Sequence, residues 1–251
     1  MKRLMLIAFL CGVLCYHGNL YADNPTISLA TGEWAPYTSQ DMVGHGVFTE
    51  IVKAIFEEIG IEPLYTFYPW KRAEYLVKEG SAFAAFPYFQ TDERKKIFYF
   101  SAPVMISTGR LFYLKRNFPN GIDYKKLDEL ASYKISGVLG YWYETPFKEA
   151  HLNVEYVVSD EQSIKKLYLD RVELVASEEL VGWSLIKHLY PKEASLFGTI
   201  DPPLNQDELR LMISKNYPNA IELTKRFNSG LEAIRKNGIL SQILAKHGVR
   251  Q

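Results

Sequence analysis

The stretch GVFTEIVKAIFEEIGI, residues 46–61, carries apolar side chains at the spacing of one helix face. They recur at i, i+3, i+4, i+7, i+8 and i+11, at Phe48, Ile51, Val52, Ile55, Phe56 and Ile59. Charged residues occupy the opposite face, and Gly60 follows as a residue that commonly ends helices. The pattern predicts an amphipathic helix that packs one face on a core.

The segments around this helix alternate between strand and helix patterns. Strands are predicted at residues 26–30, 61–68 and 82–86, and a second helix is predicted at 70–78. The third strand is a short apolar run, which suits a buried parallel strand. The order strand-helix-strand-helix-strand implies a parallel sheet with helices on its faces.

The second half of the chain repeats this alternation. A strand at 107–115 leaves the first unit, and a strand at 208–214 leads back to two helices at 220–236 and 240–246. The segment between them holds predicted strands at 134–138, 154–158 and 173–176 and predicted helices at 124–130, 143–150, 163–169 and 180–189. The chain is therefore predicted to be an α/β protein with two units of similar build.

The composition favours a globular protein and speaks against a nucleic-acid partner. Apolar residues make up 47% of the 251 residues, which is enough for one large domain or two modest ones. Lys plus Arg and Asp plus Glu both number 29, so the formal net charge is zero. Because the sequence also lacks a basic stripe, we expect no nucleic acid to bind.

The N-terminus has the pattern of a secretory signal peptide. Lys2 and Arg3 precede an apolar run over residues 4–14, which is too short to span a membrane. Ala22 is a small residue at a suitable cleavage position, so residues 1–22 are predicted to be removed on secretion. An uncleaved N-terminal anchor is the alternative interpretation.

The sequence gives no sign of catalytic or metal chemistry. Cys11 and Cys15 both lie in the predicted leader, so the mature chain has no thiol or disulfide. No HExxH, P-loop or Ser-His-Asp order is present, and no paired spacing suits a metal, among the mature histidines His45, His151, His188 and His247. We expect no cofactor, no metal and no enzyme activity.

Seven motifs occur in the order of one known family. They are ATGEWAPYT, GVFTEIVKAIFEEIGI, YPWKRAEYLVKEG, TDERKKIFYFSAPV, SGVLGYWYE, VELVASEELV and FNSGLEAIRKNGILSQILAKHG. In this register the chain, from Thr26 to Gly248, resembles the family 3 extracellular solute-binding proteins, the polar amino acid receptors of ABC transporters.

The resemblance implies a type II periplasmic-binding-protein-like fold. Two α/β lobes would be joined by two hinge crossovers and would close around a ligand. Lobe 1 would comprise residues 23–112 and 217–251, and lobe 2 residues 113–216. The resemblance further implies a periplasmic monomer whose partners are an amino acid-like small molecule and an inner-membrane permease or sensor.

Two charged residues match the family's ligand contacts. Burying a free amino acid between lobes requires a cation for its carboxylate and an acid for its ammonium. The resemblance assigns these roles to Arg94, in the T-x-x-R motif that begins at Thr91, and to Glu178, where the family usually has aspartate. Asp160 is a possible second acid. The alternatives are a surface arginine that caps the Thr91 turn and two acids at helix N-termini.

Aromatic residues are the other candidates. The resemblance places Trp34 and Trp70, and less firmly Tyr37, on the ligand, although each could instead belong to the core. The GVLGYW loop, residues 137–142, supplies a hydroxyl and backbone amides to the carboxylate in the family, and free N–H groups at a helix start suit an anion. Here the loop's small hydroxyl residues are replaced by two aromatics, Tyr141 and Trp142.

The carboxylate cradle departs from the family pattern. Members with ordinary amino acid specificity carry small hydroxyl residues where this chain has Pro87 and Phe89. Pro87 has no N–H to donate, and Tyr88 is the nearby residue that could substitute with its hydroxyl. A cleft so rich in aromatics also suits a flatter, larger or cationic ligand.

Two further functions are compatible with the same fold. A sensory binding protein that reports to a membrane kinase would use the same closed form as a transport receptor. A periplasmic dehydratase-like enzyme is the second alternative, because fold does not fix function. Turnover of prephenate or arogenate would identify the enzyme.

Overall fold

The computed structural model describes residues 25–249. The predicted signal peptide, its cleavage site after Ala22 and both cysteines lie outside the described residues. Within the described range, no helix combines the length and the apolar character needed to cross a membrane.

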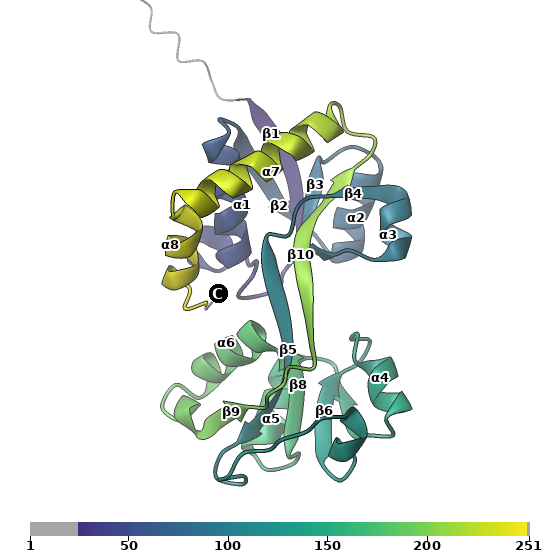
Figure 1. Cartoon of the computed structure of the whole chain (residues 1–251), viewed down its shortest axis with the longest axis vertical. Coiled ribbons are helices and arrows are strands. Elements are labelled where there is room, and N and C mark those ends of the chain that lie inside the picture. The colour runs from purple at the N-terminus through teal and green to yellow at the C-terminus, as the bar shows by residue number, and fades with distance from the viewer. Residues whose placement is uncertain (1–24, 250–251) are drawn as a thin grey trace, which may run out of the picture.

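Two bodies of helices and strands lie at opposite ends of the molecule and are joined by two long strands (Figure 1). These strands are β5 (Met105–Leu114) and β10 (Asn205–Ser214), which pair antiparallel. One sheet runs through both bodies in the order β2-β1-β3-β10-β5-β8-β6-β7. The two-lobed α/β fold with two crossovers is confirmed, while the residues at which each lobe begins and ends stay a prediction.

Lobe 1 is built from two separate segments of the chain. Strand β1 pairs in parallel with both β2 and β3, as the predicted βαβαβ order requires. The C-terminal helices return to pack beside α1 (Figure 1). The elements are β1 (Thr26–Thr31), η1 (Val43–His45), α1 (Val47–Glu58), β2 (Glu62–Phe67), α2 (Trp70–Lys78), β3 (Ala84–Phe89), α3 (Asp92–Ile97), β4 (Phe98–Phe100), α7 (Ala220–Lys236) and α8 (Ile239–Lys246).

Lobe 2 is a single segment inserted between the two crossover strands. Strand β6 pairs in parallel with β7 and β8, and the helices pack against this smaller sheet. The elements are η2 (Leu127–Leu130), β6 (Lys134–Val138), α4 (Glu144–Glu149), β7 (Asn153–Val157), α5 (Asp160–Tyr168), β8 (Leu174–Glu178), α6 (Glu179–Leu189), η3 (Ala194–Leu196) and β9 (Phe197–Thr199).

The helix face predicted from residues 46–61 is the face that α1 buries. Phe48, Ile51, Val52, Ile55 and Phe56 have no exposed surface and join the core of lobe 1. Burying an apolar side chain of this size stabilises the fold by about 1.5–3 kcal/mol. This face therefore holds α1 firmly on the sheet.

Strand β3 begins two residues later and extends three residues further than predicted. The sequence argues against the extension, because Pro87 cannot donate a ladder hydrogen bond. The register of β10 shifts at this point, since Arg210 pairs with Tyr88 whereas Met212 pairs with Ala85. Two residues of β3 thus face one residue of β10, and such a bulge accommodates proline. Tyr88 and the residue after it consequently lie on a strand end.

Five short elements are absent from the sequence-based assignment, among them the 3₁₀ turns η1 and η3. Helix α3 arises from DERKKI, whose six residues show no apolar periodicity. Its one local signal is Thr91, whose hydroxyl accepts the N–H of Arg94 at 3.3 Å as an N-cap. Strands β4 and β9 have three residues each, too few for a periodic pattern. The helix predicted at 124–130 is reduced to the 3₁₀ turn η2.

Candidate functional site

A cavity of about 360 Å³ lies where the two lobes face one another, within the size range of small-molecule sites. Its walls come from the ends of β3 and β8 and from the segments that follow β1 and β6. Ligands of open α/β sheets bind at such strand ends. The lining residues are Trp34, Trp70, Pro87, Tyr88, Phe89, Arg94, Ser107, Tyr141, Trp142, Tyr143 and Glu178. Seven of the eight residues proposed from the sequence are among them, and Tyr37 is not.

Arg94 projects from the first turn of α3 towards the ring of Tyr88. Its guanidinium carbon lies 4.8 Å from the centre of that ring, and its Nη1 donates to the carbonyl of Phe89 at 3.1 Å. The carboxylate of Glu74 lies 3.6 Å from Nη2, and the Arg94 side chain is 30% exposed. Thr91 caps α3 by accepting the backbone N–H of Arg94, while the guanidinium of Arg94 lines the cavity and does not itself cap the turn.

Two tryptophans of lobe 1 form one wall. Trp34 stacks on Tyr37 at 4.5 Å between ring centres and meets Phe89 edge-on at 6.2 Å. Trp70 meets Tyr88 edge-on at 5.5 Å. The Tyr88 hydroxyl donates to the Trp70 carbonyl at 3.0 Å, and burial raises the pKa of this tyrosine. The hydroxyl proton of Tyr88 is therefore already donated to the protein backbone and not to the cavity.

The facing wall in lobe 2 rests on a buried acid. The Tyr141 hydroxyl donates to Asp160 at 2.9 Å, and the Ser177 hydroxyl donates to the other oxygen of Asp160 at 2.7 Å. Burial raises the pKa of Asp160, and these hydrogen bonds oppose the rise. Asp160 does not line the cavity, and the N-cap of α5 is Ser159. Asp160 therefore lies in the first turn of α5, as the alternative of an acid at a helix N-terminus requires, but it is not the N-cap residue.

Most backbone amides of the loop between β6 and α4 already have partners within the protein. The N–H of Val138 donates to the Tyr143 hydroxyl at 2.7 Å, and that of Gly140 donates to the Glu144 carboxylate at 2.8 Å. The N–H groups of Leu139 and Tyr141 donate to backbone carbonyls. These four N–H groups are therefore already paired, whereas those of Trp142 and Tyr143 have no hydrogen-bond partner among the described residues, so the expected donation of this loop to an anion stays a prediction.

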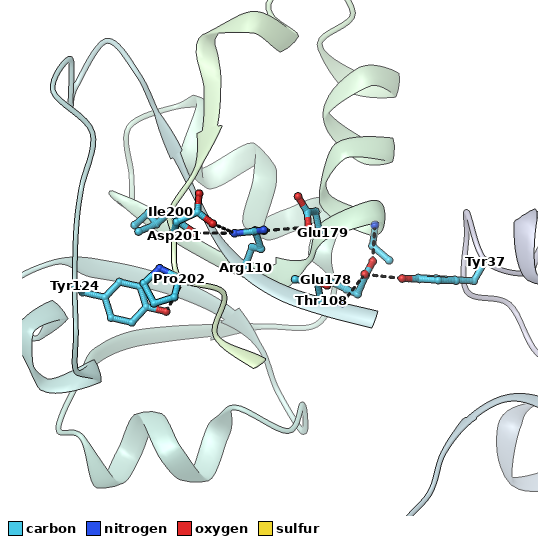
Figure 2. A network of polar contacts seen from close by, with 10 residues as sticks. Tyr37, Thr108, Arg110, Tyr124, Glu178, Glu179, Ile200, Asp201 and Pro202 are labelled. Atoms are coloured by element: carbon cyan, nitrogen blue, oxygen red, sulfur yellow. Dashed lines mark hydrogen bonds and ion pairs between the residues drawn. The ribbon is translucent and has the colours of Figure 1, made fainter. Parts of the chain in front are cut away.

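Glu178 ends β8 and caps α6. Its Oε2 accepts the N–H of Val181 at 3.0 Å, and its Oε1 accepts the Thr108 N–H at 3.3 Å. Oε1 also accepts the Tyr37 hydroxyl of lobe 1 at 2.6 Å, so this contact joins the two lobes (Figure 2). Burial raises the pKa of Glu178, although the hydrogen bonds oppose the rise.

Tyr37 lies behind the cavity wall. Its side chain is fully buried, and burial together with the nearby Glu178 carboxylate raises its pKa. The hydroxyl thus stays protonated and serves as the donor to Glu178. The predicted direct contact of Tyr37 with a ligand stays a prediction, and its position supports the stacked ring of Trp34.

The sequence matches one protein family along nearly all of the described chain. The model of the bacterial extracellular solute-binding proteins, family 3, covers residues 27–250. This chain belongs to that family. No curated protein matches the chain in sequence.

Solved structures share the fold of this family 3 protein. The unliganded, open L-cystine solute receptor of Neisseria gonorrhoeae has a TM-score of 0.71 and 19% identity, covering 90% of this chain and 93% of its own. A histidine kinase sensor domain has a TM-score of 0.67 and 17% identity, covering 89% and 96%. The ancestral amino acid-binding protein AncCDT-1, a precursor of cyclohexadienyl dehydratase, has a TM-score of 0.64 and 20% identity, covering 88% and 94%.

Two glycines of this family 3 protein have roles that sequence reasoning missed. A Cβ on Gly32 would lie 2.6 Å from the Trp70 ring, and one on Gly109 would lie 2.7 Å from the Trp142 ring. Each tryptophan therefore lies flush on bare backbone. The only local signal is a glycine at a strand end or within a strand, which can mark a close approach. Ser107 also lines the cavity without having been singled out.

Proposed function

We propose that this protein is a periplasmic solute-binding protein that captures a small polar ligand, an amino acid or a derivative, for an ABC importer. The observation that carries the proposal is the position of Arg94. Its guanidinium borders a cavity walled by aromatic rings from both lobes. A binding role explains why large rings and a cation converge where the lobes face one another.

Arg94 is proposed to bind the acidic group of the ligand. A guanidinium presents five N–H donors in a planar fork and can grip a carboxylate with two of them. The ring of Tyr88 under the guanidinium holds its plane, and Phe89 fixes one of its nitrogens. Trp34, Trp70 and Trp142 would then contact the apolar body of the ligand.

The proposal includes secretion and a membrane partner. Cleavage after Ala22 would release the chain into the periplasm, where it would act as a monomer without a cofactor. Ligand-driven closure of the lobes about β5 and β10 would create the shape that the permease recognises.

A sensory role is the second candidate, and the fold shared with a histidine kinase sensor domain favours it. Both roles predict the same ligand-loaded form, so they differ only in the partner. Capture of either a permease or a sensor kinase from solubilised inner membranes by the loaded protein would separate them.

An enzyme of the dehydratase type is the third candidate, suggested by the fold shared with AncCDT-1. Such chemistry needs a positioned acid or base in the cleft. Among the cavity-lining residues described, the one carboxylate is Glu178, and it already accepts three hydrogen bonds from the protein. We therefore favour binding over catalysis, and turnover of prephenate or arogenate would reverse that preference.

The test is a thermal-shift screen against amino acids, amines and small carboxylates, followed by Arg94→Ala. A ligand at a hundred times its Kd stabilises the protein by about 2.7 kcal/mol and raises the Tm. Arg94→Ala should weaken the best ligand roughly a hundredfold, because a charge-assisted bidentate contact is lost.

Lys95→Ala is the matched control. Lys95 is the next residue of α3, its side chain is 50% exposed, and its ion pair is to Asp92 outside the cavity. This variant should keep the affinity of the wild type. A folded Arg94→Ala protein that binds as tightly as the wild type would contradict the proposal.

A further inference from the structure

The charges that line the cleft decide which ligand groups can be recognised. Among the described residues that line it, Arg94 and Glu178 are the two with charged side chains. A zwitterionic amino acid needs donors for its carboxylate and an acceptor with room for its ammonium. The spare hydrogen-bonding capacity of each residue therefore matters more than its mere presence.

Glu178 has its acceptor positions largely occupied by the protein. A carboxylate offers about four lone-pair sites. Its three donors come from three different elements: the N–H of Val181 in α6, the N–H of Thr108 in β5 and the hydroxyl of Tyr37 in lobe 1. About one acceptor site is left, so an ammonium that takes more than one hydrogen bond from Glu178 would compete with the cap of α6, whose loss costs about 1 kcal/mol, or with the contact between lobes.

Other acids near the cleft are also committed. Both oxygens of Asp160 accept hydroxyl groups, from Ser177 and Tyr141. Glu179 pairs with Arg110 at 3.0 Å, deeper in lobe 2 (Figure 2). Neither Asp160 nor Glu179 lines the cavity. Among the residues that line the cavity, Glu178 is thus the one carboxylate, and Glu74 lies outside this lining, facing Arg94 at 3.6 Å.

Arg94 presents the opposite situation. Of its five N–H donors, one reaches the Phe89 carbonyl at 3.1 Å, and Glu74 lies at 3.6 Å, beyond a good hydrogen bond. The guanidinium is partly exposed and borders the cavity. An anionic group therefore finds donors with spare capacity.

Flat ring surfaces complete the cavity on both sides. Trp34 and Trp70 come from lobe 1, and Trp142 comes from lobe 2. The ring of Trp142 lies against the backbone of Gly109. Aromatic side chains favour stacked or edge-on contact with another planar group. The walls therefore suit a flat, apolar ligand body more than a branched aliphatic one.

We propose that the cleft selects flat organic carboxylates and does not require an α-ammonium group. Arg94 binds the carboxylate, and the tryptophans enclose the planar body of the ligand. Glu178 keeps its hydrogen bonds within the protein and makes none to the ligand. This inference rests on the proposed solute-binding function and narrows its ligand class from amino acids in general to carboxylates that carry a flat ring.

The first test compares three probes that share one ring, by isothermal titration calorimetry with the full mature chain. L-Phenylalanine carries both charges, 3-phenylpropionate carries the carboxylate alone, and phenethylamine carries the ammonium alone. We expect 3-phenylpropionate to bind at least as tightly as L-phenylalanine and phenethylamine not to bind. Tighter binding of L-phenylalanine by roughly tenfold, the value of one charged hydrogen bond, would overturn the inference.

The same titrations separate this inference from the proposed function. Binding of polar amino acids such as arginine or glutamine without binding of 3-phenylpropionate would overturn the flat-carboxylate class and leave the solute-binding function standing. Failure of every amino acid, amine and carboxylate in the screen would overturn both.

The second test frees Glu178. Tyr37→Phe removes the hydroxyl that donates to Oε1 and keeps the ring that stacks on Trp34. We expect the affinity ratio of L-phenylalanine to 3-phenylpropionate to rise roughly tenfold, because an acceptor site becomes available for the ammonium. Tyr65→Phe, elsewhere in lobe 1, is the control and should leave the ratio unchanged. An unchanged ratio in a folded Tyr37→Phe protein would count against the inference.

Discussion

The two lobes bring different chemistry to the same cleft. Lobe 1 contributes Arg94, a guanidinium with unused donors, set among aromatic rings. In lobe 2 the polar groups nearest the cleft are bonded to one another: Tyr141 donates to Asp160, and Glu178 caps α6. Lobe 2 therefore presents mainly ring surface, which comes from Tyr141, Trp142 and Tyr143.

This difference suggests a division of roles. Lobe 1 would recognise the charge of the ligand, and lobe 2 would close over its apolar body. The hydrogen bond from Tyr37 to Glu178 crosses between the lobes. It occupies the acid through which lobe 2 would otherwise recognise a positive charge on the ligand.

The largest expected effect is a difference in stability loss when a core phenylalanine is truncated in each lobe. Phe56 of lobe 1 contacts rings from two distant segments, Phe83 at 6.3 Å and Phe227 at 5.3 Å, whereas Phe147 of lobe 2 stacks at 5.0 Å on Tyr143, just before its own helix. Phe56→Ala should lower the free energy of unfolding by about 3–5 kcal/mol, because its cavity cannot collapse. Phe147→Ala should lie at the low end of this range.

Urea denaturation of both variants measures this difference, with Tyr75→Ala as the control. Tyr75 is 50% exposed, so its truncation should cost little. A larger loss for Phe147→Ala than for Phe56→Ala would show that the single-segment lobe is the more tightly constrained one.

The next effect concerns the walls. Gly109→Ala would place a methyl group 2.7 Å from the Trp142 ring and closer still to the side-chain oxygen of Asn205, so both side chains would have to move. Gly32→Ala would place one 2.6 Å from the Trp70 ring and displace it. We expect each to weaken ligand binding about tenfold, or about 1.4 kcal/mol. If lobe 2 contributes apolar contacts alone, Gly109→Ala weakens the binding of L-phenylalanine and of 3-phenylpropionate by the same factor.

Calorimetric titration of the glycine variants measures directly the factor by which each one weakens ligand binding. Ser132→Ala, at an exposed position of lobe 2, is the control and should bind as the wild type does. A change in preference between L-phenylalanine and 3-phenylpropionate in Gly109→Ala would assign charge recognition to lobe 2 as well.

The fold was accessible to prediction because its signals are local. The apolar spacing from Phe48 to Ile59 fixes α1 within one residue at each end, and α7 falls at its predicted bounds. The bulge that admits Pro87 into β3 was not accessible, since it depends on the register of β10 more than a hundred residues later. Helix α3 is short and polar, so no period marks it.

The site divides in the same way. Family motifs pointed to the residues that line the cleft, because each motif lies at a strand end or helix start. Those motifs do not show how many hydrogen-bonding positions of each group stay available to a ligand. The donor to Glu178 comes from Tyr37, 141 positions away, and the surfaces under Trp70 and Trp142 are glycines on other elements. Such pairings follow only from the folded chain.

The smallest effect is a contrast between two acids, one in each lobe. Glu50 of α1 is partly buried, which raises its pKa, but hydrogen bonds from Lys246 and His247 outweigh this, so its pKa lies below the ordinary 4.5. The pKa of Glu178 lies above 4.5, because burial outweighs its hydrogen bonds. The two carboxylates should therefore change stability in opposite directions with pH.

The stability that Glu50 contributes is present above pH 4.5 and is lost as the pH falls through its lowered pKa. The folded state binds a proton at Glu178 more tightly than the unfolded chain does, so the contribution of Glu178 is present below pH 4.5 and is lost as the pH rises through its raised pKa. Urea denaturation of the wild type, Glu50→Gln and Glu178→Gln across the acid range isolates each contribution as a difference. A wild-type advantage over Glu178→Gln that grows with pH would mean that its hydrogen bonds favour the carboxylate more than burial disfavours it. Lobe 2 would then hold a stable charge at the cleft, and the contrast between a charge-reading lobe and an apolar wall would not stand.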